Sequence, residues 1–110
     1  MEVKNKVVIV TGAGSGIGKA ASIHFASHGA IVVVSDINFD SAKNVADEIV
    51  TLGGKSLLVK TDVTKFQEVE DLVNQTLSNY EKLDVIVNNA GIGPNLLPTH
   101  KARFLSLIHI

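Results

Sequence analysis

The sequence contains no cysteine and only one tyrosine in 110 residues. The absence of cysteine excludes disulfides, cysteine-bound zinc, iron–sulfur clusters and thiol nucleophiles. No apolar segment approaches the roughly 20 residues that span a bilayer, and the N-terminal segment is unlike a signal peptide. A formal net charge of −1 offers no basic surface to nucleic acid or to an anionic membrane. The composition predicts a soluble, cytoplasmic domain with no nucleic-acid partner and no membrane partner.

Four short apolar segments predict buried strands. They occupy residues 7–10, 31–34, 57–59 and 85–87, and three of them consist of valine and isoleucine. Each segment is apolar at every position rather than at alternate positions, which is typical of strands that are covered on both faces.

Helical periodicity separates these segments. Apolar residues recur at i, i+3, i+4 and i+7 within residues 17–25, 42–50 and 69–77, and the second segment stops at Gly53, which can end a helix at positive φ. The apolar face predicted for the first helix consists of Ile17, Ala20, Ala21, His24 and Phe25. Strands that alternate with helices pair in parallel. The sequence therefore predicts an α/β fold, a Rossmann-type doubly wound parallel sheet that is incomplete, with element order β-α-β-α-β-α-β and strand order 3-2-1-4.

A glycine-rich segment, TGAGSGIG at residues 11–18, joins the first predicted strand to the first helix. Ligands of open parallel sheets bind at the carboxyl ends of the strands, and a helix that begins there offers free N–H groups to a diphosphate. Gly12 can turn the chain, Gly16 can let the backbone approach the ligand, and Gly18 can let the helix pack closely. The predicted dinucleotide-binding residues of this turn are Gly12, Ser15, Gly16, Ile17 and Gly18. The alternative is a flexible loop with a chance run of glycines.

Three further motifs follow the later strands: SDI at residues 35–37, TDVT at 61–64 and VNNAG at 87–91. Together with TGAGSGIG, they resemble the short-chain dehydrogenase/reductase family in content and order, from residue 6 to about residue 93. The resemblance implies a nicotinamide-dependent oxidoreductase that acts on an alcohol or carbonyl group of a small-molecule substrate. It also implies that the parent protein is a homo-oligomer.

Asp36 is the residue that predicts the choice of cofactor. It stands at the end of the second predicted strand, near the distance from the glycines at which a carboxylate meets the adenosine ribose. A carboxylate accepts hydrogen bonds from ribose hydroxyls and repels a 2′-phosphate, and the neighbouring Ser15 and Ile37 are neutral. We therefore predict that the cofactor is NAD rather than NADP. The alternative role of Asp36 is to cap the second helix, although Asn38 or Asp40 suits that role better.

The resemblance assigns the remaining cofactor contacts to two loops. Asp62 and Val63 would lie beside the adenine, and Asn89, Ala90 and Gly91 would line the adenosine ribose and the cofactor. The alternatives are an ordinary loop start at Asp62 and an ordinary turn formed by the two asparagines and the glycine.

No catalytic residue and no metal site are predicted for this chain. The family uses a tyrosine with a lysine four residues later, beyond the fourth strand, whereas Tyr80 precedes that strand and is followed at that spacing by Asp84. His24 and His28 have a spacing that suits zinc, but no third ligand is evident. Residues 1–93 are predicted to form the dinucleotide-binding half, and 94–110 an atypical tail. The chain alone is therefore expected to lack turnover. The alternative function is a nucleotide-binding regulator or pseudoenzyme that is complete at this length.

Overall fold

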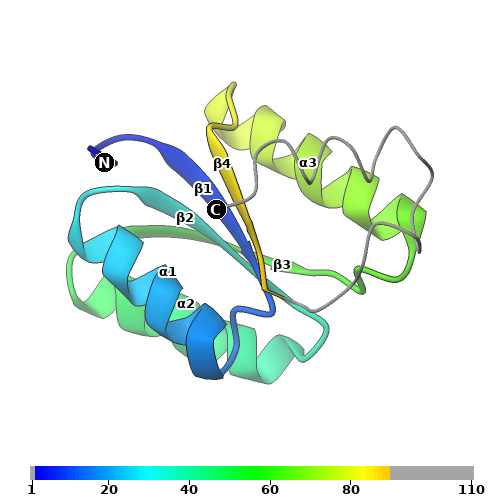
Figure 1. Ribbon diagram of the computed structural model, residues 1–110, viewed down its shortest axis with the longest axis horizontal. Helices are drawn as coiled ribbons and strands as arrows, with labels where there is room; N and C mark the ends of the chain where they lie inside the picture. The colour runs from blue at the N-terminus through cyan, green and yellow to red at the C-terminus, as the bar shows by residue number, and fades with distance from the viewer. Residues whose placement is uncertain (1, 90–110) are drawn as a thin grey trace.

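A computed structural model of the protein describes residues 2–89 (Figure 1). Strands and helices alternate along the chain as β1 (Val7–Thr11), α1 (Gly16–Ser27), β2 (Ile31–Asp36), α2 (Phe39–Thr51), β3 (Lys55–Lys60), α3 (Phe66–Tyr80) and β4 (Val85–Asn88). Every predicted element is present, and each strand is slightly longer than the apolar segment that predicted it. Two predicted site residues, Ala90 and Gly91, and the tail at 94–110 lie outside the described residues.

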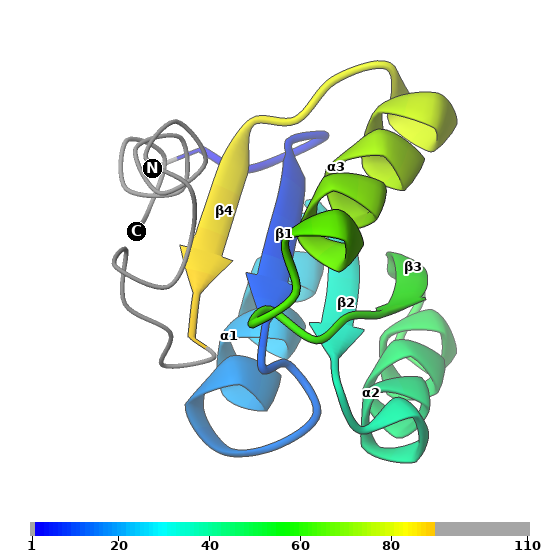
Figure 2. The ribbon, with the colours of Figure 1, turned by 90° about the vertical axis from the view of Figure 1, so that its right-hand side faces the viewer.

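The four strands form one parallel sheet in the order β3-β2-β1-β4, which confirms the predicted topology. Val8 of β1 lies opposite Val32 of β2 and Val85 of β4, so β1 is paired along both of its edges. Figure 2 shows all four strands pointing toward one end of the sheet, where the loop between β1 and α1 also lies. This arrangement is of the Rossmann type, and it brings the four predicted motifs to the carboxyl ends of the strands.

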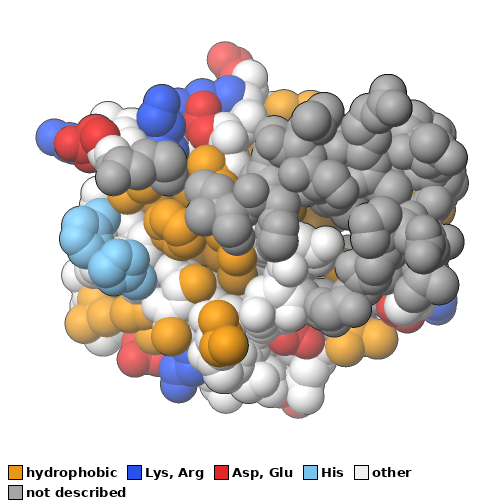
Figure 3. Space-filling model, in the orientation of Figure 1, with side chains coloured by type: hydrophobic (Ala, Val, Ile, Leu, Met, Phe, Trp, Pro, Cys, Tyr) orange, Lys and Arg blue, Asp and Glu red, His pale blue; other side chains and the backbone are white. Residues whose placement is uncertain are grey.

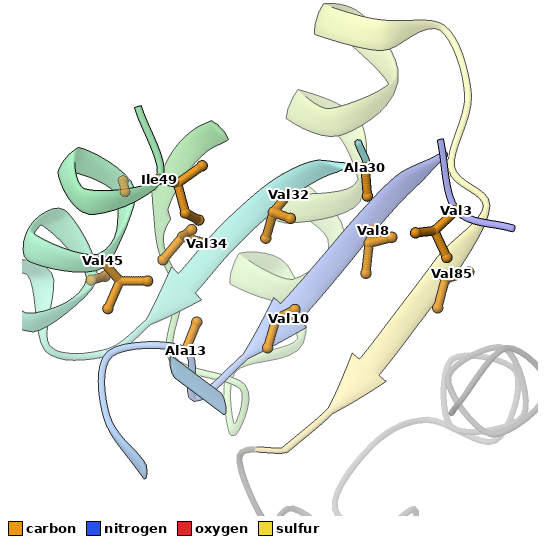
Figure 4. Packing of buried hydrophobic residues seen from close by; sticks show 12 residues of the cluster. Val3, Val8, Val10, Ala13, Ala30, Val32, Val34, Val45, Ile49 and Val85 are labelled. Atoms are coloured by element: carbon orange, nitrogen blue, oxygen red, sulfur yellow. The ribbon is translucent and has the colours of Figure 1, made fainter. Parts of the chain in front are cut away.

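Helices cover both faces of the sheet, which explains why the strands are apolar at every position. Val8, Val10 and Val34 face α1 and α2 (Figure 4), whereas Ile9 and Ile86 face α3. All five side chains are almost completely buried. Each contributes about 1.5–3 kcal/mol of hydrophobic stabilisation relative to an exposed position. No helix within residues 2–89 has the length and hydropathy that crossing a bilayer requires.

The predicted apolar face of α1 was largely wrong. Ile17 is 79 % exposed and His24 is also exposed, whereas the helix buries Gly18 and Ser22. These two small residues are four positions apart, and the Ser22 hydroxyl donates to the Gly18 carbonyl at 2.8 Å. The helix therefore contacts the sheet through these small residues together with Ile23, Phe25 and Ala26. Other apolar side chains of the helix, such as Ile17, stay exposed on the face that also carries its histidines (Figure 3).

The amino ends of β1 and β4 are joined through Asp84. One of its carboxylate oxygens accepts the Val7 N–H at 2.8 Å, and its own N–H donates to the Val7 carbonyl at 3.0 Å. Lys82 adds an ion pair at 3.2 Å. The hydrogen bond from Val7 is the main reason that the pKa of Asp84 lies below its usual value. Hydrogen bonds and an ion pair within the protein thus join β1 to β4 at the amino end of the sheet.

Candidate functional site

The loop between β1 and α1 forms an open cradle at the carboxyl end of the sheet. Gly12 and Gly16 have φ values of +63° and +58°, in the left-handed region that favours glycine. A Cβ atom built on Gly16 would meet no atom of residues 2–89 within 4 Å, so this part of the chain leaves the space beside Gly16 open. Ser15 precedes the helix in an extended conformation, and its side chain makes no capping hydrogen bond. The first turn of α1 therefore keeps N–H groups that can bind an anion.

Gly18 is required for a different reason, which is close packing. A Cβ atom on Gly18 would overlap the Gly12 carbonyl and lie 2.7 Å from Nδ2 of Asn89. That amide nitrogen donates to the same Gly12 carbonyl at 3.2 Å. Gly18 thus lets α1 approach the first strand, as its place in the motif predicted, and lets Asn89 tie the turn to the end of β4.

Asp36 lies at the end of β2 and faces the glycine turn. Its Oδ2 accepts the Gly14 N–H at 2.8 Å, and its Oδ1 accepts the Asn38 N–H at 3.0 Å. The residue that caps α2 is Asn38, whose side-chain oxygen accepts the Ser41 N–H at 3.0 Å. The alternative that Asp36 caps this helix is therefore wrong.

A cleft of about 270 Å³ lies between the ends of β1, β2 and β3. Its lining residues are Gly12, Asp36, Ile37, Thr61, Asp62, Val63 and Thr64. Thr61 is 2 % exposed, and its hydroxyl has no hydrogen-bond partner among the described residues. An unpaired buried hydroxyl is costly. Thr61 is also one of the residues that line the cleft.

Asp62 combines a local role with a place in the cleft. Its Oδ1 accepts the Thr64 hydroxyl at 2.6 Å and the Thr64 N–H at 3.0 Å. Both hydrogen bonds lower the pKa of Asp62, and the bond from the Thr64 hydroxyl has the larger effect. The carboxylate therefore stabilises the loop after β3, as the alternative interpretation proposed, and it also faces the space beside Asp36.

Thr11 links the ends of β1 and β4 and is one of three residues whose roles the sequence did not reveal. Its hydroxyl accepts the Asn89 N–H at 3.0 Å and lies 3.2 Å from Oδ1 of Asn88. The other two residues are Gly14 and Thr61. All three belong to the quoted motifs, but their roles depend on contacts between segments that are distant in sequence.

The three residues that the sequence set aside lie away from the cleft. His24 and His28 lie side by side at the exposed end of α1, with ring centroids 4.4 Å apart and the rings inclined by 43°. Within residues 2–89, no group of three His, Asp or Glu side chains is placed to hold a metal ion. Tyr80 ends α3 at the amino end of the sheet and packs against the apolar cluster that includes Val7. Burial raises its pKa.

The sequence matches the short chain dehydrogenase family over residues 6–110. The chain belongs to this family.

Relatives of this short-chain dehydrogenase include named enzymes. The 7alpha-hydroxysteroid dehydrogenase of Escherichia coli (strain K12) is 48 % identical over 93 residues, which are 84 % of this chain and 36 % of the relative. The cyclohexanol dehydrogenase of Acinetobacter sp. (strain SE19) is 46 % identical over 88 residues, which are 80 % of this chain and 35 % of the relative. The chain thus spans about a third of the length of these relatives.

A solved structure supports the same assignment. The crystal structure of hydroxysteroid dehydrogenase from Escherichia coli superimposes with a TM-score of 0.79 at 48 % identity. The match covers 84 % of this chain and 38 % of that structure. The β1-to-β4 unit of this short-chain dehydrogenase is therefore the fold of its family, and the glycine turn and the cleft belong to that shared unit.

Proposed function

We propose that this chain is the NAD-binding portion of an oxidoreductase that interconverts alcohol and carbonyl groups of a small molecule by hydride transfer. The observation that carries the proposal is the cleft beside the glycine turn. It combines Gly12 of that turn, the Asp36 carboxylate and the buried Thr61 hydroxyl, which has no partner among the described residues. The open start of α1 follows the same turn. Family membership supplies the reaction class, since the named relatives are alcohol dehydrogenases.

The residues of the cradle fit a dinucleotide. Gly12, Ser15, Gly16, Ile17 and Gly18 would surround the diphosphate, whose charge suits the N–H groups and the partial positive charge at the start of α1. The open space at Gly16 leaves room for the diphosphate to approach the backbone. When it is bound, NAD supplies the acceptor or the donor of the hydride.

The remaining contacts follow the path from the turn along the strand ends. Asp36 would accept the ribose hydroxyls. Asp62 and Val63 would contact the adenine from the far wall of the cleft. Asn89 fastens the turn to β4, and we place Ala90 and Gly91 beside it along the cofactor.

Asp36 also carries the proposed preference for NAD over NADP. A 2′-phosphate would meet its carboxylate at close range, and Ile37, which is 58 % exposed beside it, offers no positive charge.

We further propose that the 110 residues alone lack turnover, because their only tyrosine, Tyr80, lies at the opposite end of the sheet. The parent protein is proposed to be a cytoplasmic homo-oligomer.

The test compares binding of NADH and NADPH by calorimetry in the full-length protein. The wild type should bind NADH more tightly. Asp36→Ala should remove much of this preference, and Asp36→Arg should reverse it, because a guanidinium attracts the 2′-phosphate. Asp40→Ala is the control, since Asp40 is an exposed acid at the start of α2 that does not line the cleft. Equal affinities for both cofactors in the wild type would refute the assignment.

A further inference from the structure

Gly14 was not among the predicted cofactor-binding residues, yet it lies at the most crowded point of the turn. A Cβ atom built on it would lie 2.7 Å from Cβ of Ser41, 2.9 Å from Oδ2 of Asp36 and 3.2 Å from the backbone nitrogen of Ala42. Its φ lies outside the left-handed region, unlike those of Gly12 and Gly16. Glycine is therefore needed at this position for space and not for backbone conformation.

Gly14 also donates a hydrogen bond to the Asp36 carboxylate that lies against it. The Gly14 N–H holds Oδ2 of Asp36 at 2.8 Å, and the Asn38 N–H holds Oδ1 at 3.0 Å. One hydrogen bond on each oxygen fixes both the position and the rotation of the carboxylate. Two of the roughly four acceptor positions of a carboxylate are then used, and about two remain for a ligand.

We propose that Gly14 is a specificity-determining residue, which positions Asp36 so that the two free acceptor positions of its carboxylate meet the two ribose hydroxyls. This inference rests on the proposed function, in which Asp36 binds the ribose. A fixed carboxylate binds NAD without first losing side-chain freedom. The same carboxylate cannot rotate away from a 2′-phosphate. Gly14 thus strengthens binding of NAD and rejection of NADP through one contact.

The main variant is Gly14→Ala, in which the added methyl group must displace the carboxylate, the start of α2, or both. We expect the affinity for NADH to fall by about tenfold, as for the loss of one hydrogen bond to a charged group, and the affinity for NADPH to stay level or rise. Calorimetry of both cofactors in the full-length protein measures this ratio. Gly54→Ala is the matched control, because its Cβ would lie 2.9 Å from Ile49 at the other end of the sheet.

A double variant shows whether the effect passes through Asp36. With Asp36→Ala already present, adding Gly14→Ala should leave the ratio of NADH to NADPH affinity within about twofold, because the carboxylate to be positioned is absent. A purely structural role of Gly14 would weaken both cofactors alike and would not depend on Asp36.

A second pair of variants tests the hydrogen bond from the Asn38 N–H to Asp36 without adding bulk to the glycine turn. Asn38→Pro and Asn38→Ala both lose the side-chain cap of α2, but only the proline variant also loses the N–H that holds Oδ1 of Asp36. The proline variant should therefore show the lower preference for NADH. This comparison tests the positioning of Asp36 even if Gly14→Ala does not fold.

The outcomes separate the two proposals. If the wild type shows no preference for NADH, or Asp36→Ala leaves it intact, both proposals fail. If Asp36→Ala removes the preference but Gly14→Ala and Asn38→Pro preserve it, the proposed function stands and the positioning role is wrong. A change in the ratio caused by Gly14→Ala that is equally large with and without Asp36 also overturns the positioning role.

Discussion

The two ends of the sheet use similar residues for opposite purposes. At the amino end, the Asp84 carboxylate is bound to the Val7 N–H and Lys82, so its acceptors serve the fold. At the carboxyl end, the Thr61 hydroxyl is buried and has no partner within the described part of the chain, which also leaves the space beside Gly16 open. The Asp84 carboxylate at the first end is satisfied within the protein. We propose that the second end keeps groups for a ligand, so that stability and binding are concentrated at opposite ends of the same strands.

This contrast can be tested with matched residues, because each end carries a glycine at positive φ. Gly16→Val should reduce the affinity for NADH by roughly a hundredfold or more, about 3 kcal/mol, because the branched side chain enters the space of the diphosphate. The positive φ should also cost about 1–2 kcal/mol of stability. Calorimetry and thermal unfolding measure the two effects.

Gly53→Val is the control for that prediction. Gly53 has a φ of +89°, and a Cβ on it would also meet no atom within 4 Å. The variant should lose similar stability but bind NADH as the wild type does. Equal loss of binding in both variants would show that backbone strain, and not the site, accounts for the effect at Gly16.

An aspartate with a lowered pKa at each end provides the second test. Asp84→Ala should reduce the free energy of unfolding by about 1–3 kcal/mol at pH 7, because the Val7 N–H loses its acceptor. NADH binding should be unchanged. Asp62→Ala should weaken NADH binding and should cost less stability than Asp84→Ala, because its two hydrogen bonds with Thr64 are exposed to solvent. A loss of NADH affinity in Asp84→Ala would contradict the separation of the two ends.

The contribution of Asp84 should also depend on pH in a defined direction. Its pKa is lower in the folded state than the unfolded value of about 3.9. The stabilisation is therefore present in full above the unfolded pKa and is lost as the pH falls through the folded pKa. The difference in stability between wild type and Asp84→Ala should hold from pH 7 to about pH 5 and shrink below about pH 4. Urea unfolding across this range measures it.

The smallest effects are expected from Thr61 and Ser35, the two buried hydroxyls that have no hydrogen-bond partner within residues 2–89. Thr61→Val should raise the stability of the free protein by about 1 kcal/mol, because an unsatisfied polar group is removed, and should reduce the stabilisation that NADH confers. Ser35→Ala should bring a similar gain without affecting NADH, because Ser35 does not line the cleft. Melting temperatures with and without NADH distinguish the two, and an equal response to NADH would remove Thr61 from the site.

The sequence predicted the strands and their order because continuous β-branched segments are a local signal of burial on both faces. It did not predict which side of α1 is buried, since Gly18 and Ser22 contribute too little apolar area to stand out in a periodic pattern. The place of Asp36 followed from its spacing to the glycines. The proposed role of Gly14 did not, because the residues that crowd it, Asp36 and Ser41, are distant in sequence and nothing in the sequence distinguishes it from the other glycines of the turn. Spacing and residue type thus predict which motifs reach the site better than they predict contacts between segments that are distant in sequence.

The pairing of β1 with β4 has a consequence for how the chain acquires its structure during synthesis. The Val7 N–H binds a carboxylate that lies 77 residues later in the chain. At a translation rate of about 5–20 residues per second, the ribosome needs several seconds or more to reach that partner. β1 can pair with β2, and β2 with β3, in that interval, but the other edge of β1 stays apolar and open. The nascent chain therefore exposes an aggregation-prone edge until β4 emerges, and chaperone binding to ribosome-bound chains should peak in that interval.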